Sequence, residues 1–93
     1  MSLEPIWIAG RWQTEPSPQG ELQSYNPRTG EALAPRFPIS GEATLRTALR
    51  AGRAAAEELR NVTPERIAAF LERCASNLEA DRDALVDSAH LET

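Results

Sequence analysis

The chain has 93 residues, enough for one small domain that buries little more than ~60% of the surface of its unfolded form. Its apolar fraction of 41% and charged fraction of 26% are typical of globular proteins, and no stretch approaches the ~20 apolar residues of a membrane span or the pattern of a signal peptide. A net charge of -4 argues against nucleic acid and membranes as partners, because binding to phosphate groups needs a basic surplus. We therefore expect a cytoplasmic protein. Met1, Ser2 and Leu3 are set aside, because an expression vector can leave such residues.

The first predicted element is a β-hairpin within residues 5–13. Two short runs of β-prone residues flank Ala9 and Gly10, and a two-residue loop there would place Trp7 opposite Trp12. Cross-strand aromatic pairs stabilise a hairpin by roughly 0.2 to 1 kcal/mol relative to alanine pairs. We interpret the two tryptophans as holding the hairpin to a core, and we prefer this interpretation to a stacking platform for a ligand.

A second hairpin is predicted after a loop. Residues 14–21 are rich in proline, glycine and polar side chains, which indicates an exposed loop that tolerates insertions. Leu22–Tyr25 would then run antiparallel to Glu31–Ala34. Pro35 and Pro38 would forbid a long ladder and confine this hairpin to a sheet edge or the surface, because proline has no N–H to donate.

Three residues specify the turn of the second hairpin. Asn26 can accept a hydrogen bond from the backbone two residues on, Pro27 fixes φ at the first turn position, and Gly30 accepts a positive φ. Two-stranded hairpins are marginal on their own. We therefore expect both hairpins, together residues 5–35, to need a body on which to lie.

From Ser40 the apolar residues recur at three- and four-residue spacing. This period predicts an amphipathic helix over residues 40–60, with Ser40 as its N-terminal cap. Small residues in the apolar stripe would let another backbone approach closely, which suits a helix packed on a sheet. The stripe consists of Leu45, Ala48, Leu49, Gly52, Ala55, Ala56 and Leu59.

Further helices are predicted over residues 63–79 and 81–92. Thr63 is a good cap, and Pro64 fits the first position of the longer helix, whereas Asp81 would cap the shorter one. The segment is thus predicted to consist of two short β-hairpins followed by two to three α-helices. The apolar stripe of the longer helix consists of Ile67, Phe70, Leu71, Cys74 and Leu78.

No group of residues predicts catalysis. Cys74 is the only cysteine, so no internal disulfide can form, and its apolar helical face suggests an inert core thiol. His90 has no second histidine or cysteine at metal-ligand spacing. No glycine-rich phosphate loop is present, so we assign no catalytic, cofactor-binding or metal-binding residue to the segment. The acidic residues near the C-terminus are typical of a solvated face rather than of paired catalytic carboxylates; they are Glu79, Asp81, Asp83 and Asp87.

The order of the motifs along the chain is also informative. It is carried by Ile8-Ala9-Gly10-Arg11-Trp12, Asn26-Pro27-Arg28-Thr29-Gly30-Glu31, Arg66 with Phe70 and Leu71, and Leu91-Glu92-Thr93. In this order the chain resembles the N-terminal region of the aldehyde dehydrogenase superfamily from about Ile6 to its last residue, and the Asn-Pro-x-Thr-Gly element is the most specific match. Ala9 stands where asparagine is frequent, and Pro35-Arg36-Phe37-Pro38 replaces a smoother strand, so the subfamily is less well defined than the family.

The resemblance implies that residues 1–93 are the N-terminal part of a larger α/β cofactor-binding domain with a Rossmann-like sheet, and not a complete domain. The whole enzyme would oxidise a small aldehyde to a carboxylic acid with NAD or NADP, using a cysteine thiolate and a water-activating glutamate. This segment would pack against the remainder of its own chain in a homo-oligomer. The resemblance places no catalytic or cofactor residue within the segment, which is therefore expected to be inactive and to bind no cofactor alone.

A competing hypothesis is a small, independent α+β interaction module that binds a partner through the stripe between Leu45 and Leu59. A reading frame that continues past Thr93 to encode a catalytic cysteine and glutamate would favour the enzyme. A stop codon directly after Thr93 would favour the module. In either case the apolar stripes need a covering surface from outside the segment, because the local sequence supplies too little sheet.

Overall fold

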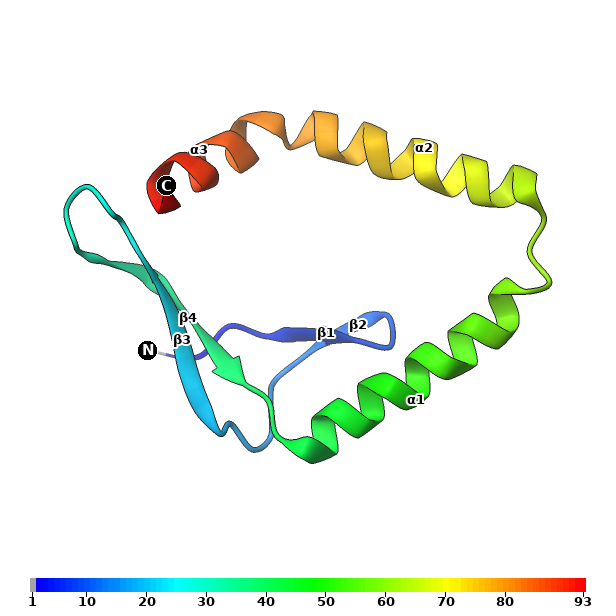
Figure 1. The fold of residues 1–93 in the computed structure, drawn as a ribbon, viewed down its shortest axis with the longest axis horizontal. Coiled ribbons are helices and arrows are strands. Elements are labelled where there is room, and N and C mark those ends of the chain that lie inside the picture. The colour runs from blue at the N-terminus through cyan, green and yellow to red at the C-terminus, as the bar shows by residue number, and fades with distance from the viewer. Residues whose placement is uncertain (1) are drawn as a thin grey trace.

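The computed structural model describes residues 2–93, so Met1 lies outside the described residues, while Ser2 and Leu3 precede the first strand. Two antiparallel hairpins are followed by three helices, as the sequence predicted (Figure 1). The helices form an arc that leaves the hairpins at one end of the chain and returns to them at the other (Figure 1). The elements are β1 Ile6–Ile8, β2 Arg11–Gln13, β3 Gly20–Tyr25, β4 Ala32–Ile39, α1 Glu42–Leu59, α2 Pro64–Ala80 and α3 Arg82–Glu92.

The first hairpin has the predicted register. Trp7 pairs with Trp12 across β1 and β2, and their rings meet edge to face with centroids 5.2 Å apart. Ala9 and Gly10 form the loop at φ 55° and 80°, which are the two positive values that a tight hairpin turn of this hand requires. Ala9 is the only non-glycine residue among residues 2–93 at a positive φ, a conformation that is strained for alanine.

The turn of the second hairpin also forms as predicted. The Asn26 side-chain Oδ1 accepts a hydrogen bond from the Arg28 N–H at 2.9 Å, and Gly30 adopts φ 75°. The Asn26 N–H in turn donates to the Glu31 carbonyl at 2.9 Å, which closes the loop. Local turn chemistry alone therefore fixes where the chain reverses.

The second ladder is longer than the sequence predicted, because β4 continues through both prolines to Ile39. The Arg36 carbonyl faces away from β3 and accepts a hydrogen bond from the Glu4 N–H at 2.8 Å. Pro38 lies two residues further along the strand and shares this orientation, so its missing N–H removes no bond to β3. Pro35 lies close to the register shift that interrupts the ladder. The expectation that these prolines forbid a long ladder is wrong.

Helix α1 begins one residue later than its predicted Ser40 cap implies. Its N-cap is Gly41 rather than Ser40, no side chain caps it, and the helix ends at Leu59. Glycine is tolerated at an N-cap position because the cap residue has an extended backbone. Glycine has no side chain, however, so it cannot accept a hydrogen bond from the first N–H groups of the helix.

Helices α2 and α3 agree with the predicted ranges to within about one residue at each end. Thr63 caps α2 as predicted, since its Oγ1 accepts a hydrogen bond from the Arg66 N–H at 3.3 Å. Asp81 occupies the N-cap position of α3, but its side chain makes no capping hydrogen bond, so that predicted role is wrong. The two helices run on almost directly, and Asp81 is the single residue between them.

No hydrophobic side chain among residues 2–93 is buried. The solvent-accessible surface is 7896 Å², whereas a compact protein of 10.2 kDa exposes roughly 5,300 Å². The radius of gyration is 17.1 Å, compared with about 12 Å for a compact chain of this length. The sequence-based expectation of ~60% burial is therefore too high, because an arc one layer thick cannot enclose a core.

Replacing Ala9 with asparagine should stabilise the first hairpin, because asparagine tolerates a positive φ and Asn-Gly is the preferred pair for this turn. We expect a gain of about 1 kcal/mol, measured through the circular dichroism of the coupled Trp7 and Trp12 rings. Ala9→Val is the matched control and should destabilise the hairpin, since a β-branched residue is strongly disfavoured at positive φ. An unchanged or weaker tryptophan signal in Ala9→Asn would contradict the assigned turn.

Candidate functional site

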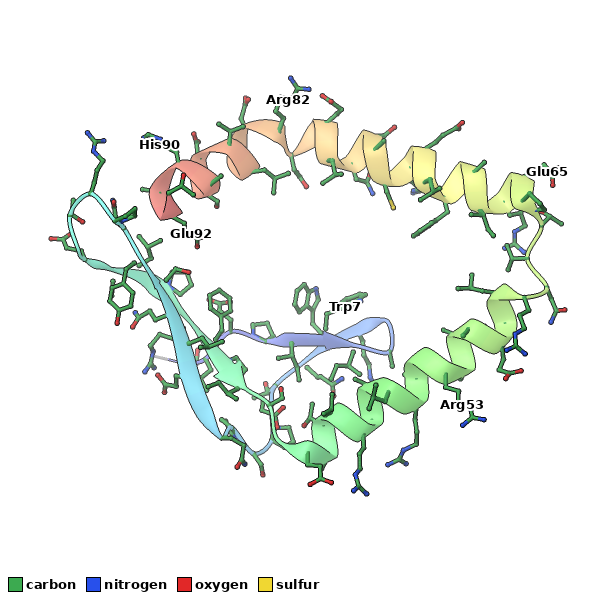
Figure 2. The ribbon with its side chains drawn as sticks, in the orientation of Figure 1. Trp7, Arg53, Glu65, Arg82, His90 and Glu92 are labelled. Carbon is green, nitrogen blue, oxygen red and sulfur yellow. The ribbon has the colours of Figure 1, made fainter. Side chains whose placement is uncertain are left out.

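Cys74 is half-buried on α2, so the prediction of an enclosed core thiol is wrong for this chain. Phe70 and Leu78 on the same helical face are 64% and 61% exposed, which leaves no apolar enclosure around the sulfur. His90 lies on a different helix, α3, and points away from the space that the arc encloses (Figure 2). The structure thus leaves Cys74 as a lone, partly exposed thiol rather than as half of a Cys–His pair.

The acidic residues near the C-terminus form a solvated surface. Glu79 pairs with Arg82 at 2.6 Å, and both side chains are 65% exposed. No group of three or more His, Cys, Asp or Glu residues within residues 2–93 is arranged to hold a metal ion. Across the same residues, none of the helices combines the length and apolar character needed to cross a bilayer.

Glu15 is the one buried side chain within the described part of the chain, at 4% exposure. Its Oε1 accepts hydrogen bonds from the Ser17 N–H at 3.0 Å and from the Thr44 hydroxyl at 2.9 Å. The first bond holds the carboxylate in its own loop, and the second reaches the first turn of α1. Gly41 provides no side-chain cap. Glu42 in the first turn, and Glu15 through the Thr44 hydroxyl, place the negative charge that a helix N-terminus favours.

The sequence predicted an exposed loop over residues 14–21, and Glu15 is the exception within it. Most of the loop is exposed, but Glu15 is enclosed, and β3 already begins at Gly20. The local sequence holds only a slight signal, since Pro16 and Pro18 stiffen the loop around the carboxylate. Nothing local indicates Thr44, which lies 29 residues away.

The hydrogen bonds around Glu15 lower the pKa of its carboxyl group. The Ser17 N–H is the largest cause, and the hydroxyls of Ser40 and Thr44 act in the same direction. Loss of solvent around the carboxylate raises the pKa in opposition. The hydrogen bonds outweigh desolvation, so the net effect lowers the pKa.

Helix α1 meets the first hairpin through its small residues. These residues line a cavity of about 290 Å³ with the hairpin; the full lining is Trp7, Ile8, Ala9, Ala48, Ala51, Gly52 and Ala55. Leu45 and Leu49, in the same predicted stripe, are 55% and 63% exposed. A side chain at Gly52 would meet no atom within 4 Å, so no backbone among residues 2–93 makes the predicted close approach there.

A concave apolar corner lies where α1 turns into α2. It encloses about 400 Å³ and is lined by Leu59, Val62, Arg66, Ile67, Phe70 and Leu71. Five of these six residues are apolar, and Arg66 supplies the only charge. The labelled charged residues Arg53 and Arg82 point away from the arc, whereas Trp7 points into the space it encloses (Figure 2).

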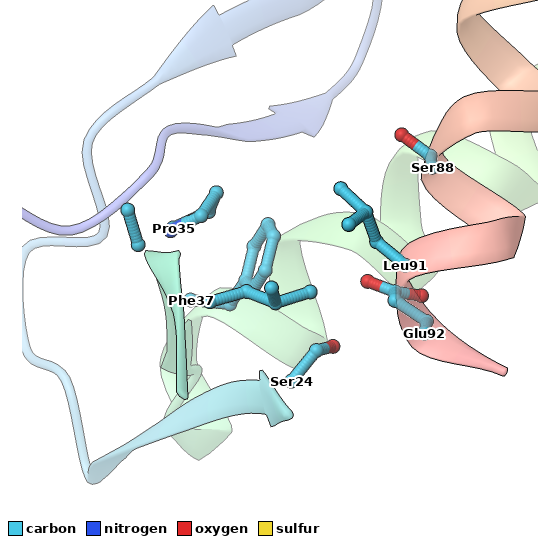
Figure 3. Close-up of a pocket in the computed structure, with 8 residues that line it drawn as sticks. Ser24, Pro35, Phe37, Ser88, Leu91 and Glu92 are labelled. Carbon is cyan, nitrogen blue, oxygen red and sulfur yellow. The ribbon is translucent and has the colours of Figure 1, made fainter. Parts of the chain in front are cut away.

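A second apolar hollow lies where α3 returns to the second hairpin (Figure 3). It measures about 240 Å³ and is lined by Ser24, Leu33, Ala34, Pro35, Phe37, Ser88, Leu91 and Glu92. The labelled Phe37 and Leu91 project into it from opposite sides (Figure 3). The two hollows together expose concave apolar surface at the α1–α2 turn and beside the second hairpin.

Comparisons with known proteins give these features a context. The sequence model of the aldehyde dehydrogenase family matches residues 12–93. The alpha-ketoglutaric semialdehyde dehydrogenase 2 of Azospirillum brasilense is 36% identical over 75 residues, which make up 80% of this chain and 14% of that protein. The chain thus spans only a small part of this relative's length. No solved structure matches the chain.

Acid should loosen the contact between Glu15 and α1, because a protonated carboxyl loses the charge that its donors stabilise. The folded pKa is lowered, so the contribution to stability is complete above the ordinary glutamate pKa of about 4.3 and is lost as pH falls through the lower folded value. We expect the helical circular dichroism of the parent to fall in this acid range, and Glu15→Gln to lack that part of the transition. Glu31→Gln, on the exposed turn, is the control that keeps it. Superimposable pH profiles for the parent and Glu15→Gln would refute this role.

Proposed function

The chain belongs to the aldehyde dehydrogenase family, and we propose that it forms the N-terminal, non-catalytic part of an enzyme that oxidises an aldehyde to a carboxylic acid with NAD or NADP. The family match over residues 12–93 carries the proposal. The exposed apolar surface of the described residues supports it, because a part of a larger domain packs through such surface.

In this proposal residues 1–93 are part of an α/β cofactor-binding domain with a Rossmann-like sheet, and they do not form a complete domain. The main partner of the segment is the remainder of its own polypeptide. The excess of roughly 2,600 Å² over a compact protein of this mass is comparable to the surface buried in obligate interfaces. We further propose a cytoplasmic homo-oligomer as the working form of the enzyme.

The chemistry is assigned to residues outside this segment. A cysteine thiolate would attack the carbonyl carbon, hydride would leave that carbon for the nicotinamide, and a glutamate would activate the water that hydrolyses the thioester. In this proposal Cys74 does not take the first role, because it does not match the family's catalytic motif. The contribution of the segment is to support the fold that holds these groups.

The polypeptide encoded by the complete reading frame should reduce NAD or NADP in the presence of an aldehyde. The relative's name makes α-ketoglutaric semialdehyde the first substrate to test. The purified 93-residue chain should show no aldehyde-dependent reduction, because it carries no nucleophile with a base. A reading frame that ends at Thr93, or a longer product inactive with a panel of aldehydes and both cofactors, would favour the interaction module instead.

The 93-residue chain in isolation should be either self-associated or loosely packed, because its apolar side chains remain in contact with water. Sedimentation measures the first property, and near-ultraviolet dichroism of Trp7 and Trp12 during a thermal scan measures the second. We expect the near-ultraviolet signal to come only from the local Trp7–Trp12 contact and to disappear over a broad temperature range. A monomer with one sharp cooperative transition would argue against an incomplete domain.

A further inference from the structure

We draw no further inference here: the strongest candidate, the cavity of about 420 Å³ between the N-terminal segment and the loop that follows β2, has Glu4 and Glu15 in its lining, but two carboxylates alone do not identify a ligand, and the Glu15 carboxylate belongs to the contact with α1 already described, with its Oε1 bonded to Thr44 and its Oε2 shielded from solvent rather than open to the cavity.

Discussion

The main constraint on this structure is the apolar surface that its described residues leave exposed to water. Hydrophobic burial is the main favourable contribution to folding, yet no hydrophobic side chain among residues 2–93 is buried. What remains to define the shape is local: ladder hydrogen bonds within each hairpin, the helical hydrogen bonds, and the Thr63 cap. Interactions of this kind specify elements well, but they position one element against another only weakly.

Polar interactions join segments that are distant in the sequence, in addition to the contacts of α1 with β1 and of α3 with β3. Glu15 links its loop to the first turn of α1 through Thr44, and the Glu4 N–H links the N-terminal segment to Arg36 in β4. The ion pair between Glu21 and Arg36, at 2.9 Å, lies across the second hairpin. Partly exposed pairs of this sort contribute little free energy, so they guide geometry without replacing a core. The open arc is the consequence.

This constraint connects the fold to the family. A chain that matches a small part of an enzyme's length, and that exposes most of its large hydrophobic residues, has the properties of a packing element of a larger domain. Under the proposed function, the remaining polypeptide of a longer enzyme would cover this surface, and the catalytic groups would come from it, because supporting elements and catalytic groups need not come from the same stretch of chain.

Sequence alone determined the features that depend on neighbouring residues. The Trp7–Trp12 register follows from a two-residue loop, the second turn follows from Asn26 and Gly30, and the start of α2 follows from Thr63 and Pro64. In each case donor, acceptor and backbone angle lie within a few residues, so the local pattern contains the whole cause.

The tertiary structure decided the features that depend on residues distant in the sequence. Pro38 is tolerated in β4 because its side of the strand faces away from β3, which its own sequence does not reveal. Glu15 is enclosed through Thr44, 29 residues away. Cys74 is half-buried rather than enclosed because burial depends on what packs against a helix, and the apolar periodicity of α2 indicates only that a partner is needed.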